Sequence, residues 1–376
     1  MKHNWEVCRI GHFCDVKTGK LDANASCENG LYPFFTCSKD ALRINSFSYN
    51  CECVLIAGNG DLNVKYYNGK FDAYQRTYII TVKPKFEDII SVEYLYNFFR
   101  LYISTLREKS VGGIIKFIKL GDITNAVINV PSLKVQKIIV SELNKINDTI
   151  EDCRELLRNL DALAQSLFYD TFGDPITNPK GWEMKHFKEI LYKIGSGATP
   201  KGGKQSYQGG NISLIRSLNV YNTYFKYDDL AKINANQAYE LRNVEVQFDD
   251  VLLNITGASV ARCFIVPKDT LPARVNQHVA ILRPNNKFIR PKFLHRLIIT
   301  PSFQNFLIGT ARGKSATREA LPKATLEMIK IPVPPISLQE QFAARIEQIE
   351  EQKKAVEQTI AELQTLLDSR MDYWFN

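Results

Sequence analysis

Two long stretches of the chain repeat apolar side chains at alternating steps of four and three residues. This spacing keeps the apolar positions on one stripe of a helix, as in a coiled coil. The expected core positions are Ile139, Leu143, Ile146, Ile150, Leu157, Leu160 and Leu167 in the first stretch and Phe342, Ile346, Ile349, Val356, Ile360, Leu363 and Leu367 in the second. Lys353 occupies one core position of the second stretch, a polar break that can fix the register of a helix pair.

Both helices are expected to begin just after a proline, with Ser132 and Ser337 as their N-caps. Two helices that each carry one apolar stripe most simply pair with each other. About 160 residues lie between them, so the connection permits either a parallel or an antiparallel pair. The alternative is that each helix is an ordinary amphipathic helix packed on its own globular domain.

The rest of the chain predicts two mixed α/β domains, at residues 1–131 and 182–331. Short β-type runs alternate with turns rich in Gly and Asn in both domains. The runs lie at 53–57, 78–82, 251–255 and 279–282, and helices are expected at 92–106 and 291–307. The long helices are placed at 132–173 and 332–376, with a linker rich in Gly and Pro at 174–181.

The second half of the chain repeats the first half in order. Matched pairs include Trp5 with Trp182, Leu120 with Leu321, Gln136 with Gln339, and Phe172 with Phe375. The separation between matched residues only increases along the chain, from 177 to 203. Chance matches would scatter in both directions, whereas insertions in a second copy produce a steady increase. The sequence therefore predicts an internal duplication of one domain followed by one helix.

Positive charge is concentrated in the two globular segments. Residues 1–136 carry 17 Lys and Arg against 13 Asp and Glu, and residues 175–336 carry 23 against 11. The helical segments 137–174 and 337–376 each carry 4 against 8, so both are acidic although the whole chain has a net charge of +8. Two basic domains joined to acidic helices are typical of a protein that binds nucleic acid through two surfaces.

Basic and amide side chains cluster in the predicted turns of both domains. Arg and Lys suit guanine edges and phosphates, and Asn and Gln suit adenine. The candidate DNA-binding residues are Lys17, Thr18, Lys20, Asn59, Lys65, Gln75, Arg76 and Lys116 in the first domain and Lys201, Lys204, Gln205, Arg216, Asn219, Asn254, Arg262, Asn276, Gln277, Arg312 and Lys314 in the second. Each one taken singly is more often an ordinary surface residue, so only the set supports nucleic-acid binding.

Motifs of catalysis and of metal binding are missing from the sequence. It contains no Asn-Pro-Pro-[Tyr/Phe] of an amino-methyltransferase, and the Gly-rich stretch 197–204 lacks the adjacent Gly-Lys-[Ser/Thr] of a P-loop. Cys51 and Cys53 form only a Cys-x-Cys, and the five histidines show no ligand spacing, so core thiols are favoured over zinc. We expect a non-catalytic chain that itself binds no metal.

The chain is also expected to be soluble and cytoplasmic. No run approaches the ~18 uncharged apolar residues of a membrane span, and residues 1–6 lack the apolar region of a signal peptide.

Local phrases add to the duplicated plan of a domain followed by a helix. They include Lys-Thr-Gly-Lys at 17–20, Phe-Gly-Asp-Pro at 172–175, Gly-Ser-Gly-Ala-Thr-Pro at 195–200, Asn-Gln-His-Val-Ala at 276–280 and Pro-Val-Pro-Pro at 332–335. Together and in this order, they make the chain resemble the specificity (S) subunit of type I restriction-modification systems. The resemblance covers essentially the whole chain. One departure is the entry of the first helix, 131–136, which lacks the double proline and the Glu of the second.

This resemblance implies two target recognition domains held apart by an antiparallel coiled coil, each reading one half of a bipartite double-stranded DNA target. It implies that the chain recruits two methyltransferase (M) subunits and, for cleavage, restriction (R) subunits. S-adenosylmethionine, ATP and Mg²⁺ would bind those partners and not this chain. Because the two domains have diverged in composition, we expect an asymmetric target.

Two other functions remain open at this point. The chain could be a scaffold whose coiled coil recruits proteins and whose basic domains bind nucleic acid, including RNA, without sequence choice. It could also be an enzyme with an unfamiliar site.

Overall fold

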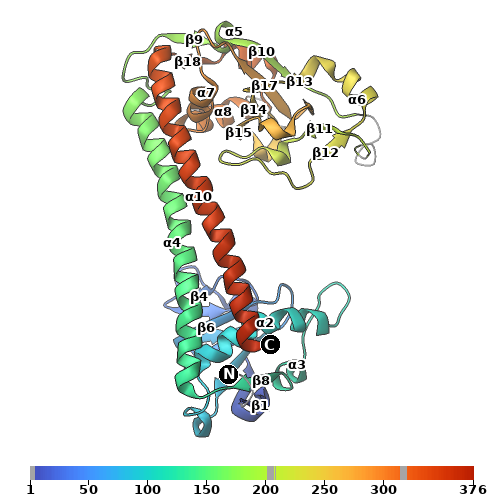
Figure 1. Cartoon of the computed structure of the whole chain (residues 1–376), viewed down its shortest axis with the longest axis vertical. Helices are drawn as coiled ribbons and strands as arrows, with labels where there is room; N and C mark the ends of the chain where they lie inside the picture. Colours follow the sequence, from blue (N-terminus) through green and yellow to red (C-terminus); the bar gives the residue numbers. More distant parts are fainter. Residues whose placement is uncertain (1–4, 201–206, 208, 314–319) are drawn as a thin grey trace. The chain divides into compact units, whose positions relative to one another are not determined.

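The computed structural model describes residues 5–200, 207, 209–313 and 320–376, and the chain divides into two compact units. The first unit contains Met1–Glu155 with Glu357–Asn376, and the second contains Leu156–Val356. Each unit holds one globular domain together with part of helix α4 (Leu133–Phe172) and part of helix α10 (Ile336–Phe375), drawn in green and red in Figure 1. The long helices therefore do not form a separate unit.

The first unit is built on a six-stranded sheet with the strand order β2-β7-β5-β6-β3-β4, and β1 and β8 form a separate antiparallel ribbon. Its elements are β1 (Glu6–Arg9), α1 (Ile10–Phe13), β2 (Cys14–Thr18), β3 (Tyr32–Phe35), β4 (Leu42–Ile44), β5 (Tyr49–Ala57), β6 (Val64–Ala73), β7 (Thr77–Val82), α2 (Val92–Lys109), α3 (Leu120–Thr124) and β8 (Val127–Val130).

Strand β5 is apolar at successive positions because both faces of the sheet are covered there. Val54 and Ile56 belong to the large core that contains side chains of α2, whereas Cys53 and Leu55 pack with Phe71 in a smaller core. Side chains alternate between the two faces of a strand, so a continuous apolar run serves two cores.

The second unit carries two four-stranded sheets, ordered β10-β17-β14-β15 and β12-β11-β16-β13, and the ribbon β9–β18. Its elements are β9 (Met184–His186), α5 (Phe187–Ile190), β10 (Leu191–Ser196), β11 (Ile212–Ile215), β12 (Ala231–Ile233), α6 (Ala235–Glu240), β13 (Glu245–Val246), β14 (Val251–Asn254), β15 (Cys263–Ile265), β16 (Ala273–Val275), β17 (Val279–Pro284), α7 (Pro291–Ile298), α8 (Pro301–Arg312), α9 (Lys323–Met328) and β18 (Lys330–Pro332).

The two globular domains share one plan, which confirms the duplication and the mixed α/β class. The order β2-β7-β5-β6 of the first sheet is repeated as β10-β17-β14-β15. In each unit a further antiparallel pair, β3–β4 or β11–β12, joins a strand in parallel, β6 or β16. The ribbons β1–β8 and β9–β18 also correspond. In the second copy the long strand β6 is replaced by β15 and β16, separated by an insertion.

One predicted helix is wrong in its extent. The apolar pattern over 291–307 suggested a single helix, but the structure has α7 ending at Ile298 and α8 beginning at Pro301. Proline cannot supply the backbone N–H that a continuing helix needs, and it fits the first turn of a new helix.

Each long helix carries a completely buried glutamine in its first turn. The side chain of Gln136 accepts a hydrogen bond from the Ser91 N–H (2.9 Å) and donates to the carbonyls of Ile89 (2.7 Å) and Pro131 (2.8 Å). Gln339 makes the same three bonds, from the Arg290 N–H (2.8 Å) and to Phe288 (2.9 Å) and Pro334 (2.8 Å). In both copies the glutamine joins the entry of α2 or α7 to the entry of the long helix.

The N-cap expected at Ser132 is consistent with α4 beginning at Leu133, but the one expected at Ser337 is wrong. Helix α10 begins at Ile336, and the Pro335 carbonyl accepts from Leu338 and Gln339. The duplication, which matches Gln136 with Gln339, places Pro335 opposite Ser132.

The two long helices pack antiparallel within each unit, which confirms the predicted coiled coil (Figure 1). In the first unit the beginning of α4 contacts the end of α10, where the Glu142 carboxylate accepts from Arg370 (3.0 Å from one guanidinium nitrogen) and from the Trp374 indole (3.0 Å). In the second unit the end of α4 meets the beginning of α10, and the rings of Phe168 and Phe342 lie 5.8 Å apart.

Most expected coil positions lie in these two packed regions. Ile139, Leu143, Ile150, Leu160, Phe342, Ile346, Ile349 and Leu367 are buried, and Ile146, Leu157, Leu167, Val356, Ile360 and Leu363 are half-buried. The polar break Lys353 donates to Asp161 at 2.6 Å. The same stripes also pack on the globular domains, so pairing between helices and packing on the domains occur together.

The segment expected as a linker, 174–181, is tied down by hydrogen bonds. Asp174 accepts from the backbone N–H groups of Ile176 (2.8 Å) and Thr177 (3.0 Å), and Asn178 bonds Trp182 in both directions. The Trp182 indole in turn donates to the Phe172 carbonyl (2.9 Å). Among the described residues, no helix is both long and apolar enough to cross a membrane.

Candidate nucleic-acid interface

In the first unit, several candidate residues meet at one edge of the sheet. Strands β2 and β5 both run antiparallel to β7, so the ends of β2 and β5 lie beside the beginning of β7. The loops that follow are bonded together: Gly19 N–H donates to Thr77 (3.0 Å), Gly58 N–H to Arg76 (2.7 Å), and Gly60 N–H to Lys116 (3.1 Å). We call the loops 18–21, 58–60, 74–77 and 111–118 the first edge.

The first edge is closely packed in its backbone and exposes both polar side chains and the apolar side chains of Ile114 and Ile115. A Cβ at Gly19 would lie 2.1 Å from the Ala73 carbonyl oxygen, so only glycine fits there. Asn59 is half-buried, and the other candidates are exposed: Lys17, Thr18, Lys20, Gln75, Arg76 and Lys116. The Gln75 amide donates to Asp22 (2.8 Å), which holds that side chain in place. The four cations are therefore brought together on or beside one surface.

Lys65 stands apart from this set. Its ammonium group donates to the Ser38 carbonyl (2.7 Å) and to the Asn63 side chain, and burial lowers its pKa from the usual value. These bonds tie β6 to the 36–40 loop through the half-buried Lys65, and its contact with DNA stays a prediction.

The second unit builds the equivalent edge from the ends of β10 and β14 and the beginning of β17. Gly197 N–H donates to the Asn276 carbonyl (3.1 Å), Ile255 N–H to His278 (3.0 Å), and Leu321 N–H to Ile255 (2.8 Å). A Cβ at Gly197 would lie 1.8 Å from the Val275 carbonyl oxygen, the counterpart of the close approach at Gly19. We call the loops 196–200, 255–259 and 276–278 the second edge.

The side chains of the second edge differ from those of the first. Gln277 is exposed and its amide oxygen contacts the Thr199 hydroxyl, and the Thr256 hydroxyl lies 2.5 Å from His278 Nδ1. Thr199, Thr256 and His278 were not among the predicted contact residues. Their signal was available, because they flank the strand ends that the duplication matches to the first edge.

Three predicted base-reading amides are instead structural. Asn219 and Asn254 are completely buried; Asn219 donates to the Lys226 carbonyl (2.9 Å) and Asn254 to the Ser217 carbonyl (2.9 Å). The Asn276 side chain, also buried, accepts from the His278 N–H (3.0 Å). Asn219 and Asn254 have no exposed surface and Asn276 only 6%, so these side chains do not reach a base edge in this structure and the three assignments are corrected.

Two arginines of the second unit lie against tyrosine rings. The Arg262 guanidinium stands 4.6 Å from the ring centre of Tyr221, which stacks on Tyr224 at 4.5 Å and 11°. Arg216 stands 5.7 Å from Tyr207 and donates to the Asp229 carbonyl. Its Nε is buried with no hydrogen-bond partner within the described part of the chain. The tyrosines were not predicted, because nothing local to them in the sequence indicates an arginine partner.

Arg312 is exposed at the end of α8. Its neighbour Ala311 accepts from Ala320, which forms a bridge with Thr256, so Arg312 lies near the second edge. Lys201, Lys204, Gln205 and Lys314 lie outside the described residues.

The cysteines carry the chemistry of core thiols. Cys53 is completely buried and Cys51 half-buried on β5, and burial raises the pKa of both thiols. Over the described ranges, no three His, Cys, Asp or Glu side chains are grouped so as to hold a metal ion. The two edges offer cations, amides and hydroxyls, which are groups that bind a polyanion and hydrogen-bond to base edges.

Known proteins are similar to this chain over most of its length. A family model described as the type I restriction modification DNA specificity domain matches residues 2–160 and 179–365. The type I restriction enzyme EcoDI specificity subunit of Escherichia coli is 26% identical over 374 residues, covering 92% of this chain and 81% of that protein. The EcoBI specificity subunit of the same organism is 22% identical over 288 residues, covering 70% of this chain and 60% of that protein.

Solved structures share the fold. The S subunit of a type I restriction-modification system from M. genitalium aligns with a TM-score of 0.59 and 15% identity, covering 99% of this chain and 96% of that one. A chain from work on complex assembly and conformational transition of the type I restriction-modification system aligns with a TM-score of 0.57 and 18% identity, covering 98% and 97%. Because the family model matches most of the sequence, in both halves of the duplication, the chain belongs to the type I restriction-modification DNA specificity family.

Proposed function

We propose that this chain is the DNA sequence-specificity subunit of a type I restriction-modification complex, and that each unit contacts one half of a bipartite DNA target through its edge. The main support for this proposal is that both units use the same strand order, whereas the loops at their two edges carry different side chains. A shared scaffold with divergent polar loops is what a protein needs to read two different half-sites with one architecture.

The two edges offer different chemistry to DNA. The first edge presents the flexible cations Lys20, Arg76 and Lys116, which suit phosphates and guanine edges. The second edge presents the Gln277 amide and the Thr256 hydroxyl, which suit base edges. Different donors and acceptors select different bases, and we therefore propose an asymmetric target.

Arg262 is the strongest candidate for base contact in the second unit. Its guanidinium is held over Tyr221, so the side chain loses less rotamer freedom on binding than a free arginine would. Arginine also donates two parallel hydrogen bonds to guanine, whereas the tyrosine face contributes stacking area without sequence choice.

We further propose that the chain is non-catalytic and acts by positioning partners. Two methyltransferase subunits and, for cleavage, restriction subunits would dock on it, and S-adenosylmethionine, ATP and Mg²⁺ would bind to those partners. Membership of the specificity family supports this division of labour, because the family model describes a DNA specificity domain.

A competition experiment separates this function from a scaffold that binds nucleic acid without sequence choice. The chain and its methyltransferase subunit are bound to a labelled duplex that contains the target, and unlabelled duplexes are added at increasing concentration. We expect the target duplex to compete at least about 1,000-fold better than a scrambled duplex of equal length. Equal competition by both duplexes would rule out sequence specificity.

A further inference from the structure

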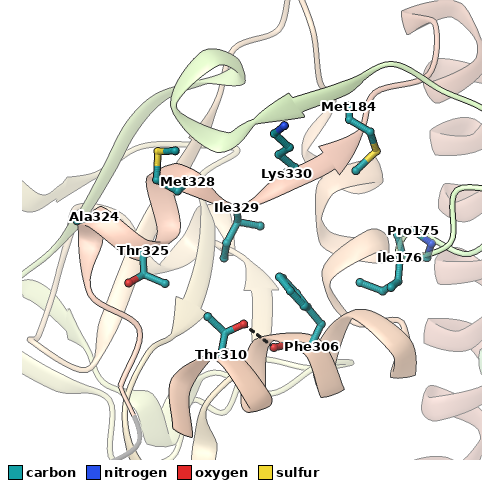
Figure 2. A pocket seen from close by; sticks show the side chains of 10 residues that line it. All are labelled: Pro175, Ile176, Met184, Phe306, Thr310, Ala324, Thr325, Met328, Ile329 and Lys330. Atoms are coloured by element: carbon teal, nitrogen blue, oxygen red, sulfur yellow. Dashed lines mark hydrogen bonds between the residues drawn. The ribbon is translucent and has the colours of Figure 1, made fainter. Parts of the chain in front are cut away.

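An apolar groove of about 730 Å³ lies on the second unit, between α8, α9 and the ribbon β9–β18 (Figure 2). One wall is α8, which contributes Phe306 and Thr310 one turn apart, and the other is α9 with Met328. Ile176 and Met184 close it from the segment that follows α4. Figure 2 shows that these side chains come from different elements around one common space.

The groove concentrates exposed apolar surface. Ile176 is 45% exposed, Met184 39%, Phe306 40% and Met328 54%. Single exposed apolar side chains are common on proteins, but several that converge on one hollow mark a place where another molecule binds. The two methionines suit such a surface because their side chains are flexible and polarisable.

Positive charge lines the rim. Lys330 borders the groove, and the Lys188 ammonium lies 3.6 Å from the Met328 sulfur. The carboxylates of Glu183 and Glu327 are paired with Lys185 (2.6 Å) and Lys323 (3.6 Å). Lys188 and Lys330 have no ion pair with any described residue, so the groove offers two cations to an acidic partner.

This charge argues against a second copy of the chain as the occupant. Residues 175–336 carry 23 Lys and Arg against 11 Asp and Glu, so two such surfaces would repel each other.

The first unit repeats the exposed apolar pair. Val7 and Val127 stand at the positions that the duplication matches to Met184 and Met328, and they are 62% and 52% exposed. Both copies therefore expose apolar side chains at these two matched positions. A repeated surface is expected if the same kind of partner docks on each unit.

We propose that the groove docks an amphipathic helix of the methyltransferase subunit, with apolar side chains against Met184, Phe306 and Met328 and carboxylates near Lys188 and Lys330. A helix fits because the walls are themselves helices that present side chains one turn apart. The proposal rests on the proposed function, since it names the surface that would recruit this partner.

The test measures the affinity of the full chain for its methyltransferase subunit in the absence of DNA. Replacing Met184→Glu together with Met328→Glu should weaken binding by about tenfold or more, because buried apolar contacts at the centre of an interface dominate affinity. The matched pair Met184→Leu with Met328→Leu keeps the surface apolar and should bind within about twofold of the wild type. Tyr239→Glu, which adds a carboxylate at an exposed ring on α6, is the control for charge alone.

A second double variant tests the proposal even if the methionine-to-glutamate variant does not fold. Lys188→Glu with Lys330→Glu alters only exposed side chains at the rim, and we expect it to weaken binding and to flatten its dependence on salt. Thermal unfolding of each variant shows whether the second unit remains folded.

The outcomes are distinguishable. If the wild-type chain binds no methyltransferase subunit, both the proposed recruitment and the groove proposal are wrong. If the wild type binds, and the methionine-to-glutamate and lysine-to-glutamate variants bind as tightly as the wild type, the groove proposal alone is overturned. If the chain alone dimerises and the methionine-to-glutamate variant becomes monomeric, the groove joins two copies, and the proposal is again overturned.

Discussion

At the residue scale, single buried polar side chains hold the loops of this protein together. Gln136 and Gln339 each bind three backbone groups from two segments that are far apart in sequence. Asn219 and Asn254 each donate to a carbonyl of the loops behind the second edge, that of Lys226 and that of Ser217. A buried polar group must be hydrogen-bonded or it costs stability, so Gln136 and Gln339 each specify one arrangement of the segments that they join.

Replacing Gln136→Leu should destabilise the first unit, and Gln339→Leu the second, by about 3 kcal/mol or more each. The change leaves one N–H and two carbonyls without their partner, and each unpaired buried group costs about 1–3 kcal/mol. Hydrogen exchange read by mass spectrometry measures the effect separately in each unit. Gln341→Leu, at an exposed position of α10, is the control and should change stability by less than about 0.5 kcal/mol. A Gln339→Leu variant as stable as that control would refute the account.

The second unit should lose stability in mild acid because of His295. Burial is the main cause that lowers the pKa of this histidine to about 3, and the positive charge of the nearby Arg296 is the second. Its Nε2 lies 3.0 Å from the Asn222 carbonyl and 3.1 Å from the Cys263 carbonyl, so the neutral ring donates there. The unfolded chain takes up this proton below about pH 6.5, whereas the folded chain does so only near pH 3. Protons therefore favour unfolding throughout that window.

The expected slope is up to about 1.4 kcal/mol per pH unit between roughly pH 6.5 and 3. Denaturant unfolding of the second unit at pH 7.5 and pH 5 measures it, with His295→Gln as the variant that keeps a donor but does not titrate. The wild type should lose more stability than the variant between the two pH values. An equal loss would show that His295 is not the cause.

Lysines of the first edge should govern the salt dependence of DNA binding. Lys20→Ala and Lys116→Ala should each make the slope of log affinity against log salt shallower by about 0.9, the value for one phosphate contact. Fluorescence anisotropy with a labelled duplex at several salt concentrations measures the slope. Lys85→Ala, beyond the opposite end of β7, is the matched control and should leave it unchanged. If Lys85→Ala and Lys116→Ala behave alike, the first edge is not the contact surface.

At the element scale, each long helix completes the core of the domain that belongs to the other repeat. The end of α10 places Phe375 against Tyr94 of α2, with ring centres 5.0 Å apart. The end of α4 places Phe172 against Phe293 of α7 at 4.8 Å. The two matched phenylalanines thus occupy equivalent sites in opposite units, which is why each compact unit contains parts of both helices.

Phe375→Ala should therefore destabilise the first unit by about 3–4 kcal/mol and leave the second unit nearly unchanged, and Phe172→Ala should do the reverse. The magnitude is that of removing a buried aromatic ring and leaving a cavity. Hydrogen exchange of α2 and α7 reports the two units separately. Leu366→Ala, at a half-exposed position of α10, is the control. An effect of Phe375→Ala confined to the second unit would contradict this arrangement.

The spacing of apolar residues was sufficient to predict the long helices and their buried stripes, because a helical stripe depends only on residues close in sequence. The duplication likewise predicted that Phe172 and Phe375 are equivalent. The burial of single polar residues could not be predicted in this way. Asn219, Asn254 and Asn276 are residues of the type that reads bases, but segments distant in sequence cover them. Exposed cations such as Lys20 and Lys116 were placed correctly on one surface only after the strand order was known.

At the scale of the whole molecule, the charge pattern and the duplication describe one organisation. Each unit combines a basic domain, whose loops form one edge, with acidic stretches of both long helices. The two edges share their backbone plan but differ in side chains, so a change at one edge should affect the recognition of only one half-site.

Methylome sequencing tests that claim most directly, in cells that carry the partner subunits with the wild-type chain, with no chain, and with Gln277→Ala combined with Arg262→Ala. We predict an asymmetric bipartite methylated motif that disappears without the chain. In the variant, one half of the motif should become degenerate while the other half stays intact. A motif that persists without the chain, or a variant in which both halves change together, would contradict the account.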